Sequence, residues 1–201
     1  MRAFRPHALG YVAELDATER IVLAQVVGDV AQMLQDAAPG TGGPDDPAVA
    51  RLLPDASRDD AEVSAEFRRL TQTEVAAGKV DGLLRFARLL LDDEPEPGTR
   101  SPLLVRREDG RVVAAALTDL RLVLASRLGL ETDAAVEALH EELGSEDDPV
   151  DPADPVETDG PEDAAGAAGP GPRRFFASVF LTAGWLQESL VEGMLADLPR
   201  G

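Results

Sequence analysis

Apolar residues recur three and four positions apart in several stretches of this chain, and clusters of Gly, Pro and Asp separate those stretches. Because about 3.6 residues make one helical turn, this spacing gathers the apolar side chains on one face of a helix. The pattern is clearest over residues 23–34, 117–128 and 176–194. Each apolar face has to be buried against another element, so the spacing predicts a mainly α fold, a single helical-bundle-like domain.

Three segments interrupt the helical pattern and are expected to be flexible linkers. Two of them are short and cover residues 36–47 and 92–102. The third, 144–172, holds nine acidic residues and no basic ones, and it runs into an Ala, Gly and Pro stretch without periodicity. Such a composition buries too little apolar surface to fold, so we expect this acidic linker to be disordered. Residues 1–143 and 173–201 are then expected to form one helical domain.

The N-terminal residues predict a small β-hairpin or sheet that leads into the first helix. Residues 2–5 and 11–15 alternate loosely in polarity on either side of a turn that contains Pro and Gly, which is typical of paired strands. Asp16 stands at an N-cap position and Glu19 follows three residues later, the spacing of a capping box. We therefore expect a helix to begin directly after Asp16.

The other elements follow from the same spacing and from turn residues. Gly129 is expected to end a helix in a left-handed conformation, and Thr132 to cap the next helix. Gly78 and Gly82 could divide a long helical stretch into two. In chain order we expect a short helix at 48–53, a helical stretch at 60–91, a strand at 103–107, a turn that could lead into a second strand at 111–114, and helices at 117–128, 133–143 and 174–198.

The charge balance limits the kinds of partner. The chain has 38 acidic and 19 basic residues, a net charge of −19, which argues against a general affinity for nucleic acid. The N-terminus lacks the apolar core of a secretory signal, and the most apolar run, residues 175–186, is shorter than the ~20 residues of a membrane-spanning helix. The sequence therefore predicts a cytoplasmic protein with no membrane contact.

The residue chemistry predicts that the protein is not an enzyme. The chain has no cysteine and two histidines, which excludes thiolate nucleophiles and cysteine zinc sites. Lys79 follows a glycine but lacks the hydroxyl residue that a P-loop needs next. Glu137 and His140 have the spacing of a di-iron ligand pair, but such a site needs two pairs and His7 lies in a turn. We therefore expect no catalytic residues, no cofactor and no metal.

One corner of the sequence has the spacing of a helix-turn-helix motif, at Ala125, Gly129 and Leu130. The helix expected after this corner has no Lys or Arg, and its acidic residues are Asp133, Glu137, Glu141 and Glu142. Because DNA phosphates would repel these carboxylates, we expect an ordinary helix pair with a glycine corner. Direct DNA binding by a dimer is the main alternative.

Two features are candidates for binding a partner. Six Arg and three acidic residues make 100–127 the most basic region, and the last helix holds four of the eight aromatic residues. The arginines could instead be solvated and paired with nearby acids, and the last helix could be a core helix. As a surface, the arginines would suit an acidic partner or nucleic acid, with the acidic linker as an internal competitor. The candidate partner-binding residues are Arg106, Arg107, Arg111, Arg121, Arg127, Phe175, Phe180 and Trp185.

A family resemblance rests on short segments spread over nearly the whole chain, namely residues 4–5, 10–11, 51–54, 66–70, 117–130 and 181–190. These segments resemble a family of uncharacterised actinobacterial proteins, some of which are known as oxidative-stress transcriptional regulators (AosR). The resemblance implies a mostly helical cytoplasmic regulator that contacts a sigma factor or another transcription component. Regulation through a thiol pair is impossible in a chain without cysteine, so a redox role would have to be inherited from a partner or has been lost; the three methionines are a poor substitute.

Together these observations favour a non-enzymatic regulatory protein that recruits a protein partner. The link to transcription in the oxidative-stress response comes from the resemblance alone. The alternatives are a direct DNA-binding dimeric transcription regulator and an adaptor or structural interaction protein. The sequence leaves the oligomeric state open, and a homodimer is compatible with each of these functions.

Overall fold

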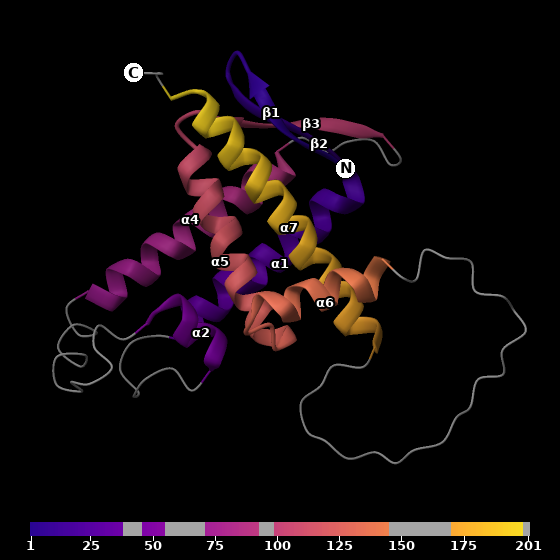
Figure 1. Cartoon of the computed structure of the whole chain (residues 1–201). Coiled ribbons are helices and arrows are strands. Elements are labelled where there is room, and N and C mark those ends of the chain that lie inside the picture. The colour runs from indigo at the N-terminus through magenta and orange to yellow at the C-terminus, as the bar shows by residue number, and fades with distance from the viewer. Residues whose placement is uncertain (38–45, 55–70, 93–98, 145–169, 199–201) are drawn as a thin grey trace, which may run out of the picture.

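A small antiparallel sheet lies at one end of a set of packed helices in the computed structural model of the chain (Figure 1). The structure describes residues 1–37, 46–54, 71–92, 99–144 and 170–198. The described elements are β1 (Arg2–His7), β2 (Gly10–Asp16), α1 (Ala17–Asp36), α2 (Pro47–Leu52), α4 (Thr73–Leu91), β3 (Arg100–Arg106), α5 (Gly110–Leu128), α6 (Asp133–Gly144) and α7 (Pro170–Ala196). The predicted mainly α fold with a small N-terminal sheet is confirmed.

The sheet contains the predicted hairpin and one further strand. Strand order is β1-β2-β3, and both neighbouring pairs are antiparallel. Strand β3 pairs with β2 from Gly10 opposite Arg106 to Asp16 opposite Arg100. The expected linker over 92–102 therefore ends too late, because residues 100–102 already belong to β3. Residues 93–98 of that linker lie outside the described residues.

The second strand expected at 111–114 is wrong, because helix α5 already begins at Gly110. A tight turn precedes it, in which the amide of Asp109 donates to the carbonyl of Arg106 at 2.9 Å. The buried positions Val113 and Leu117 then continue the helical spacing that was seen further along the chain. Packing of this apolar face on the core outweighs the weak strand preference of a short valine pair.

Local signals in the sequence set several helix ends. The capping box before α1 is confirmed: the amide of Glu19 donates to the Asp16 carboxylate at 2.9 Å, and the amide of Asp16 donates to Glu19 at 2.8 Å. Gly129 ends α5 with a φ of 71°, the left-handed conformation that glycine adopts without a Cβ penalty. Thr132 caps α6 through a 3.2 Å hydrogen bond from the amide of Ala135.

Helix α4 runs without a break through both of its glycines, so the division expected at Gly78 and Gly82 is wrong. Its buried side chains Val80, Leu83 and Phe86 lie on one face at helical spacing, and burial of that face outweighs the low helix propensity of two glycines. The earlier part of the predicted helix, 60–70, lies outside the described residues, as do 38–45 of the first linker and 145–169 of the acidic linker.

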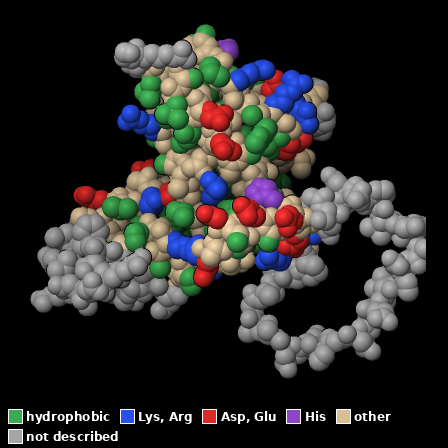
Figure 2. All heavy atoms as spheres, viewed as in Figure 1, with side chains coloured by type: hydrophobic (Ala, Val, Ile, Leu, Met, Phe, Trp, Pro, Cys, Tyr) green, Lys and Arg blue, Asp and Glu red, His purple; other side chains and the backbone are tan. Residues whose placement is uncertain are grey.

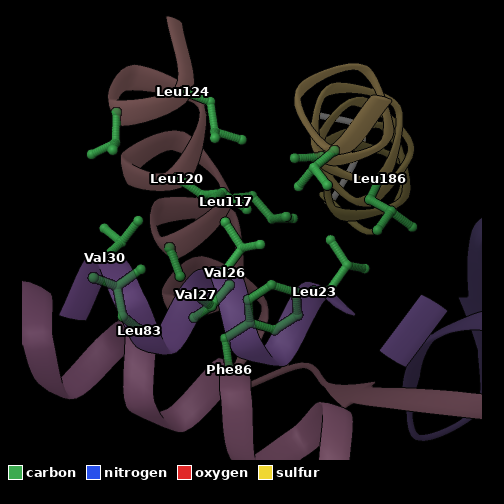
Figure 3. Packing of buried hydrophobic residues seen from close by; sticks show 14 of the residues in the cluster. Leu23, Val26, Val27, Val30, Leu83, Phe86, Leu117, Leu120, Leu124 and Leu186 are labelled. Carbon is green, nitrogen blue, oxygen red and sulfur yellow. The ribbon is translucent and has the colours of Figure 1, made fainter. Parts of the chain in front are cut away.

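The core forms where α1, α4, α5 and α7 converge (Figure 3). Figure 3 labels Val27 of α1, Phe86 of α4, Leu120 of α5 and Leu186 of α7 in this cluster. All four side chains are buried. Interlocked apolar side chains of this kind hold the helices in one arrangement.

Helix α7 packs on α5 and on β1, so the interpretation of the last helix as a core helix is confirmed. Its buried face includes Phe180, Leu186 and Leu190. The helix begins at Pro170, four residues before the predicted start, so residues 170–172 of the expected linker are helical. Among the described helices, none has the length and apolar character needed to span a membrane.

Candidate partner-binding site

The structure spreads the predicted arginines over three places. Arg106 and Arg107 lie at the end of β3, and Arg111 follows in the first turn of α5. Arg127 lies at the other end of α5, 16 residues after Arg111, which is about 24 Å along a helix. Arg121 lies between them and faces α7. These five side chains therefore do not form one basic surface.

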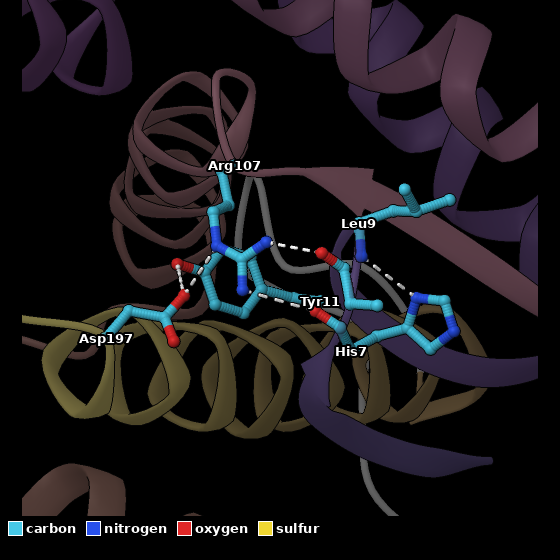
Figure 4. Close-up of polar contacts among 6 residues, drawn as sticks. His7, Leu9, Tyr11, Arg107 and Asp197 are labelled. Carbon is cyan, nitrogen blue, oxygen red and sulfur yellow. Dashed lines mark hydrogen bonds and ion pairs between the residues drawn. The ribbon is translucent and has the colours of Figure 1, made fainter.

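Arg107 has a structural role at the end of the sheet (Figure 4). Its Nε lies 3.0 Å from Oδ2 of Asp197, and its terminal nitrogens donate to the carbonyls of Ala8 at 2.7 Å and His7 at 3.3 Å. The Tyr11 hydroxyl donates to the same Asp197 oxygen at 3.0 Å. Burial, and then the hydrogen bond and negative charge of Asp197, raise the pKa of Tyr11. This cluster ties the β1–β2 turn to the end of α7.

Arg127 also belongs to a structural contact. Its guanidinium lies 2.5 Å from the carboxylate of Asp46, which caps α2 by accepting a hydrogen bond from the amide of Ala48 at 2.8 Å. Burial raises the pKa of Asp46, but the amide hydrogen bond and Arg127 lower it more, so the pKa lies below its usual value. The pairing of predicted arginines with acids is thus observed at both ends of α5.

Arg121 of α5 meets Phe180, one of the predicted aromatic residues, on the facing side of α7. Arg121 lies over the ring of Phe180, with 5.3 Å between Cζ and the ring centroid, a cation–π geometry. Its guanidinium donates to Oε1 of Gln187 at 2.8 Å, and Nε2 of Gln187 donates to Thr118 at 2.6 Å. A Cβ at Gly184 would lie 3.4 Å from Nε of Arg121, so glycine lets the guanidinium rest against α7.

Beside this contact lies a hollow of about 480 Å³ between α5, α6 and α7, which we call the α6–α7 groove. The side chains that line it include Arg121, Val136, His140, Trp185, Glu188 and Val191. Trp185 is 41% exposed and Val191 is 37% exposed. Large apolar side chains held at the surface of a folded domain are typical of interaction sites.

One carboxylate lies in the groove, and others are exposed on the helices that form it. Glu188 lines it, Glu192 follows one turn later on α7, and Glu137 and Glu141 are exposed on α6. Figure 2 shows acidic side chains gathered over α6 and the adjoining part of α7. The sequence of α6 contains no Lys or Arg, and Arg121 is half-buried against Phe180 and Gln187. The groove therefore has an apolar and aromatic wall with a negative rim.

The third aromatic candidate lies elsewhere. Phe175 is 42% exposed and makes an edge-on contact with Phe176, with 5.4 Å between the ring centroids. It lines a separate hollow of about 260 Å³ together with Val22 of α1 and Val179 of α7. Of the three predicted aromatic residues, Phe180 and Trp185 thus belong to the groove, whereas Phe175 does not.

Sequence reasoning missed the contribution of α6 to this site. His140 lines the groove, and one of its ring nitrogens lies 2.9 Å from the carbonyl of Val136. The i, i+4 spacing of Val136 and His140 places both on one face of α6, next to the face that buries Leu139. The sequence therefore shows that Val136 and His140 share a face of α6. It does not show which helix lies next to that face, because this depends on how the helices pack.

Lys79, which follows a glycine in the sequence but lacks a P-loop, has a structural role. Lys79 pairs with the buried carboxylate of Asp119 at 2.5 Å, which ties α4 to α5. In the part of the chain that the structure describes, no group of three His, Cys, Asp or Glu side chains is arranged to hold a metal ion.

The fold and the groove define a class of mainly helical proteins with a three-stranded antiparallel sheet and an exposed aromatic groove between the last two helices. Residues 1–194 match the model of a domain family described as a domain of unknown function (DUF2017), and the chain belongs to this family. Neither a curated protein nor a solved structure matches the chain.

Proposed function

We propose that the chain is a non-enzymatic regulatory protein that binds a protein partner through the α6–α7 groove. The observation that carries this proposal is Trp185, a large aromatic side chain exposed on the wall of the groove beside Val191. Trp and Arg are the residue types that most often dominate binding energy at protein interfaces. Arg121 is held in place by Phe180 and Gln187, so little conformational entropy is lost when a partner contacts it.

The class of partner follows from the family resemblance. Two segments that resemble the actinobacterial oxidative-stress regulators, 117–130 and 181–190, supply Arg121 and Trp185 to the same groove. We therefore propose that the partner is a sigma factor or another transcription component in the cytoplasm, and that the protein acts in the oxidative-stress response. Because the chain has no cysteine, the redox signal would enter through the partner.

Direct DNA binding is the weaker candidate on physical grounds. The helix after the Gly129 corner, α6, would have to enter the major groove, where Arg and Lys usually contact phosphates and guanine edges. Its exposed side chains include Glu137, and the sequence of this helix contains no Lys or Arg. A duplex would repel this surface.

Affinity capture with identification of the bound proteins tests the proposal. Tagged wild-type chain is compared with Trp185→Ala and with Leu9→Ala, which shortens a 64% exposed side chain in the β1–β2 turn. We expect wild type and Leu9→Ala to retain a sigma factor or an RNA polymerase subunit, and Trp185→Ala to lose it about tenfold or more.

Three results would contradict the proposal. Equal recovery of the transcription component by Trp185→Ala and wild type would move the contact away from the groove. Recovery of a protease or assembly complex in its place would favour the adaptor function. Steep, salt-sensitive retardation of DNA by the purified chain would favour the DNA-binding alternative.

A further inference from the structure

The exposed apolar side chains of α7 extend beyond the groove as a stripe. Leu181 is half-buried in the groove, Trp185 is exposed within it, and Leu195 is 60% exposed further along the same helix. Residues 181 and 195 are 14 positions apart, which corresponds to about 21 Å or four helical turns. A stripe of that length matches the apolar face of one partner helix laid along α7.

Carboxylates interrupt this stripe, while Arg121 lines the groove beside it and Arg111 lines a hollow with Met194 near its far end. Glu188 and Glu192 interrupt the stripe on α7, and Glu137 is exposed on α6, whose Val136 and His140 line the groove. Neighbouring carboxylates repel an acidic partner and attract a basic one, and at a surface this attraction acts chiefly on the association rate and on the choice of partner. The positive charge of Arg121 is directed at Phe180 and Gln187 inside the groove.

We infer that the segment that occupies the α6–α7 groove is a basic amphipathic helix of the partner, with apolar side chains against Trp185 and Val191 and with Lys or Arg opposite the carboxylates. This inference rests on the proposed function, because it specifies the chemistry of the partner at the same site. It differs from the alternative weighed for the arginine-rich region, a surface for an acidic partner or nucleic acid, because here this chain supplies the carboxylates and the partner the cations.

Other occupants fit the surface less well. A second copy of the chain related by a twofold axis would bring the same acidic rim against itself, with Glu188 and Glu192 of one copy close to those of the other. An extended strand would need free backbone groups for pairing, but helices form the walls of the groove. An anionic membrane surface would be repelled by the rim.

The lone tryptophan of the chain makes the groove directly observable, since all tryptophan emission comes from Trp185. The intact protein is titrated with a tryptophan-free model peptide of about 18 residues, made of Leu and Lys at amphipathic helical spacing. We expect the emission of Trp185 to shift to shorter wavelength, because the ring loses contact with water. The dissociation constant should rise about tenfold between roughly 0.05 M and 0.5 M salt. A matched peptide of Leu and Glu should not bind.

A pair of matched double variants separates the groove from the overall negative charge of the chain. Glu188→Gln with Glu192→Gln should weaken binding of the Leu and Lys peptide about fivefold or more at the lower salt concentration. Glu74→Gln with Asp81→Asn removes the same number of charges from exposed positions on α4 and should leave the affinity within about twofold. The inference is overturned if the two double variants behave alike, if both peptides bind equally, or if the Leu and Lys peptide does not bind.

The outcomes also separate this inference from the proposed function. Suppose that a sigma factor or polymerase subunit is captured through Trp185, but removing the carboxylates of the groove changes binding of neither the peptide nor the captured protein. The proposed function then stands, and the inference of a basic partner helix is wrong. If the peptide binds as expected but no transcription component is captured, the chemistry of the groove stands and the proposed partner class is wrong.

Discussion

Arg20 is a charged side chain that is buried because it has hydrogen-bond partners. It is 2% exposed on the inner face of α1, and its guanidinium reaches the carbonyl of Leu90 at 3.5 Å and that of Ser101 at 3.2 Å. Charged residues are rarely buried unless they have partners. Arg20 lies three residues before Leu23, and this spacing places it on the buried face of α1. The carbonyls that accept its hydrogen bonds come from distant segments of the chain, so they could not be predicted from the sequence.

We predict that Arg20→Ala lowers the free energy of unfolding by about 3 kcal/mol. The substitution leaves a cavity and removes hydrogen bonds from a charged donor to two buried carbonyls. Urea denaturation followed by far-ultraviolet circular dichroism measures the loss. Arg88→Ala, an exposed change on α4, serves as the control and should stay within about 0.5 kcal/mol. Equal effects of the two substitutions would show that Arg20 is not a stabilising contact.

Tyr11 gives a prediction about pH at the scale of one side chain. Burial and Asp197 raise its pKa, so above about pH 10 the folded state keeps a proton that the unfolded state has lost. The raised pKa therefore stabilises the folded state fully below about pH 10, and this stabilisation is lost as the pH rises through the pKa of Tyr11 in the folded state. Tyr11 is the single tyrosine of the chain, so tyrosinate absorbance reports its ionisation alone.

The expected midpoint of that absorbance change lies above about 10 in the folded protein and near 10 in concentrated urea. Asp197→Asn should lower the folded midpoint toward 10 without reaching it, because burial still opposes ionisation. Tyr11→Phe should lack the corresponding decrease in stability at high pH. A folded midpoint at or below that in urea would contradict the contact with Asp197.

At the scale of elements, boundaries set by local chemistry were predictable and boundaries set by packing were not. The capping box of Asp16 and Glu19 and the left-handed Gly129 involve neighbours within a few positions, so the sequence displays them directly. Strand β3 instead gains its first residues by pairing with β2, about ninety positions earlier in the chain. In the candidate site, Arg121 and Trp185 were chosen for their chemistry, but their approach depends on how α5 and α7 pack.

Helix α7 has one face buried in the core and one with exposed side chains, and two substitutions distinguish them. Leu186→Ala creates a cavity in the core where α7 packs on α5 and should lower the free energy of unfolding by about 2 to 5 kcal/mol. Leu195→Ala shortens a 60% exposed side chain on the same helix and should change it by less than about 0.5 kcal/mol. Thermal and urea denaturation measure both. Comparable losses would mean that Leu195 is covered in solution.

At the scale of the whole molecule, the described helices and strands share one hydrophobic cluster that extends from Phe4 of β1 to Leu190 of α7. The N-terminal strand and the last helix also meet directly, because the amide of Phe4 donates to the Ser189 hydroxyl at 3.1 Å. Within the described residues, strand β1 and helix α7 therefore contribute to the same core. The spacing of apolar residues predicts helices locally. The contact between β1 and α7 joins residues about 185 positions apart, so no local pattern predicts it.

Because the core is shared, we predict that the protein unfolds in one cooperative transition. Trp185 fluorescence reports the contact of α7 with its neighbours, and far-ultraviolet circular dichroism reports all helices, so the two urea transitions should have the same midpoint and slope. Leu186→Ala should move both curves together to lower urea, since removing core area from α7 destabilises every helix that packs on it. A fluorescence transition that precedes the loss of helix, with a shift of that transition alone in Leu186→Ala, would show that α7 unfolds separately from the rest of the molecule.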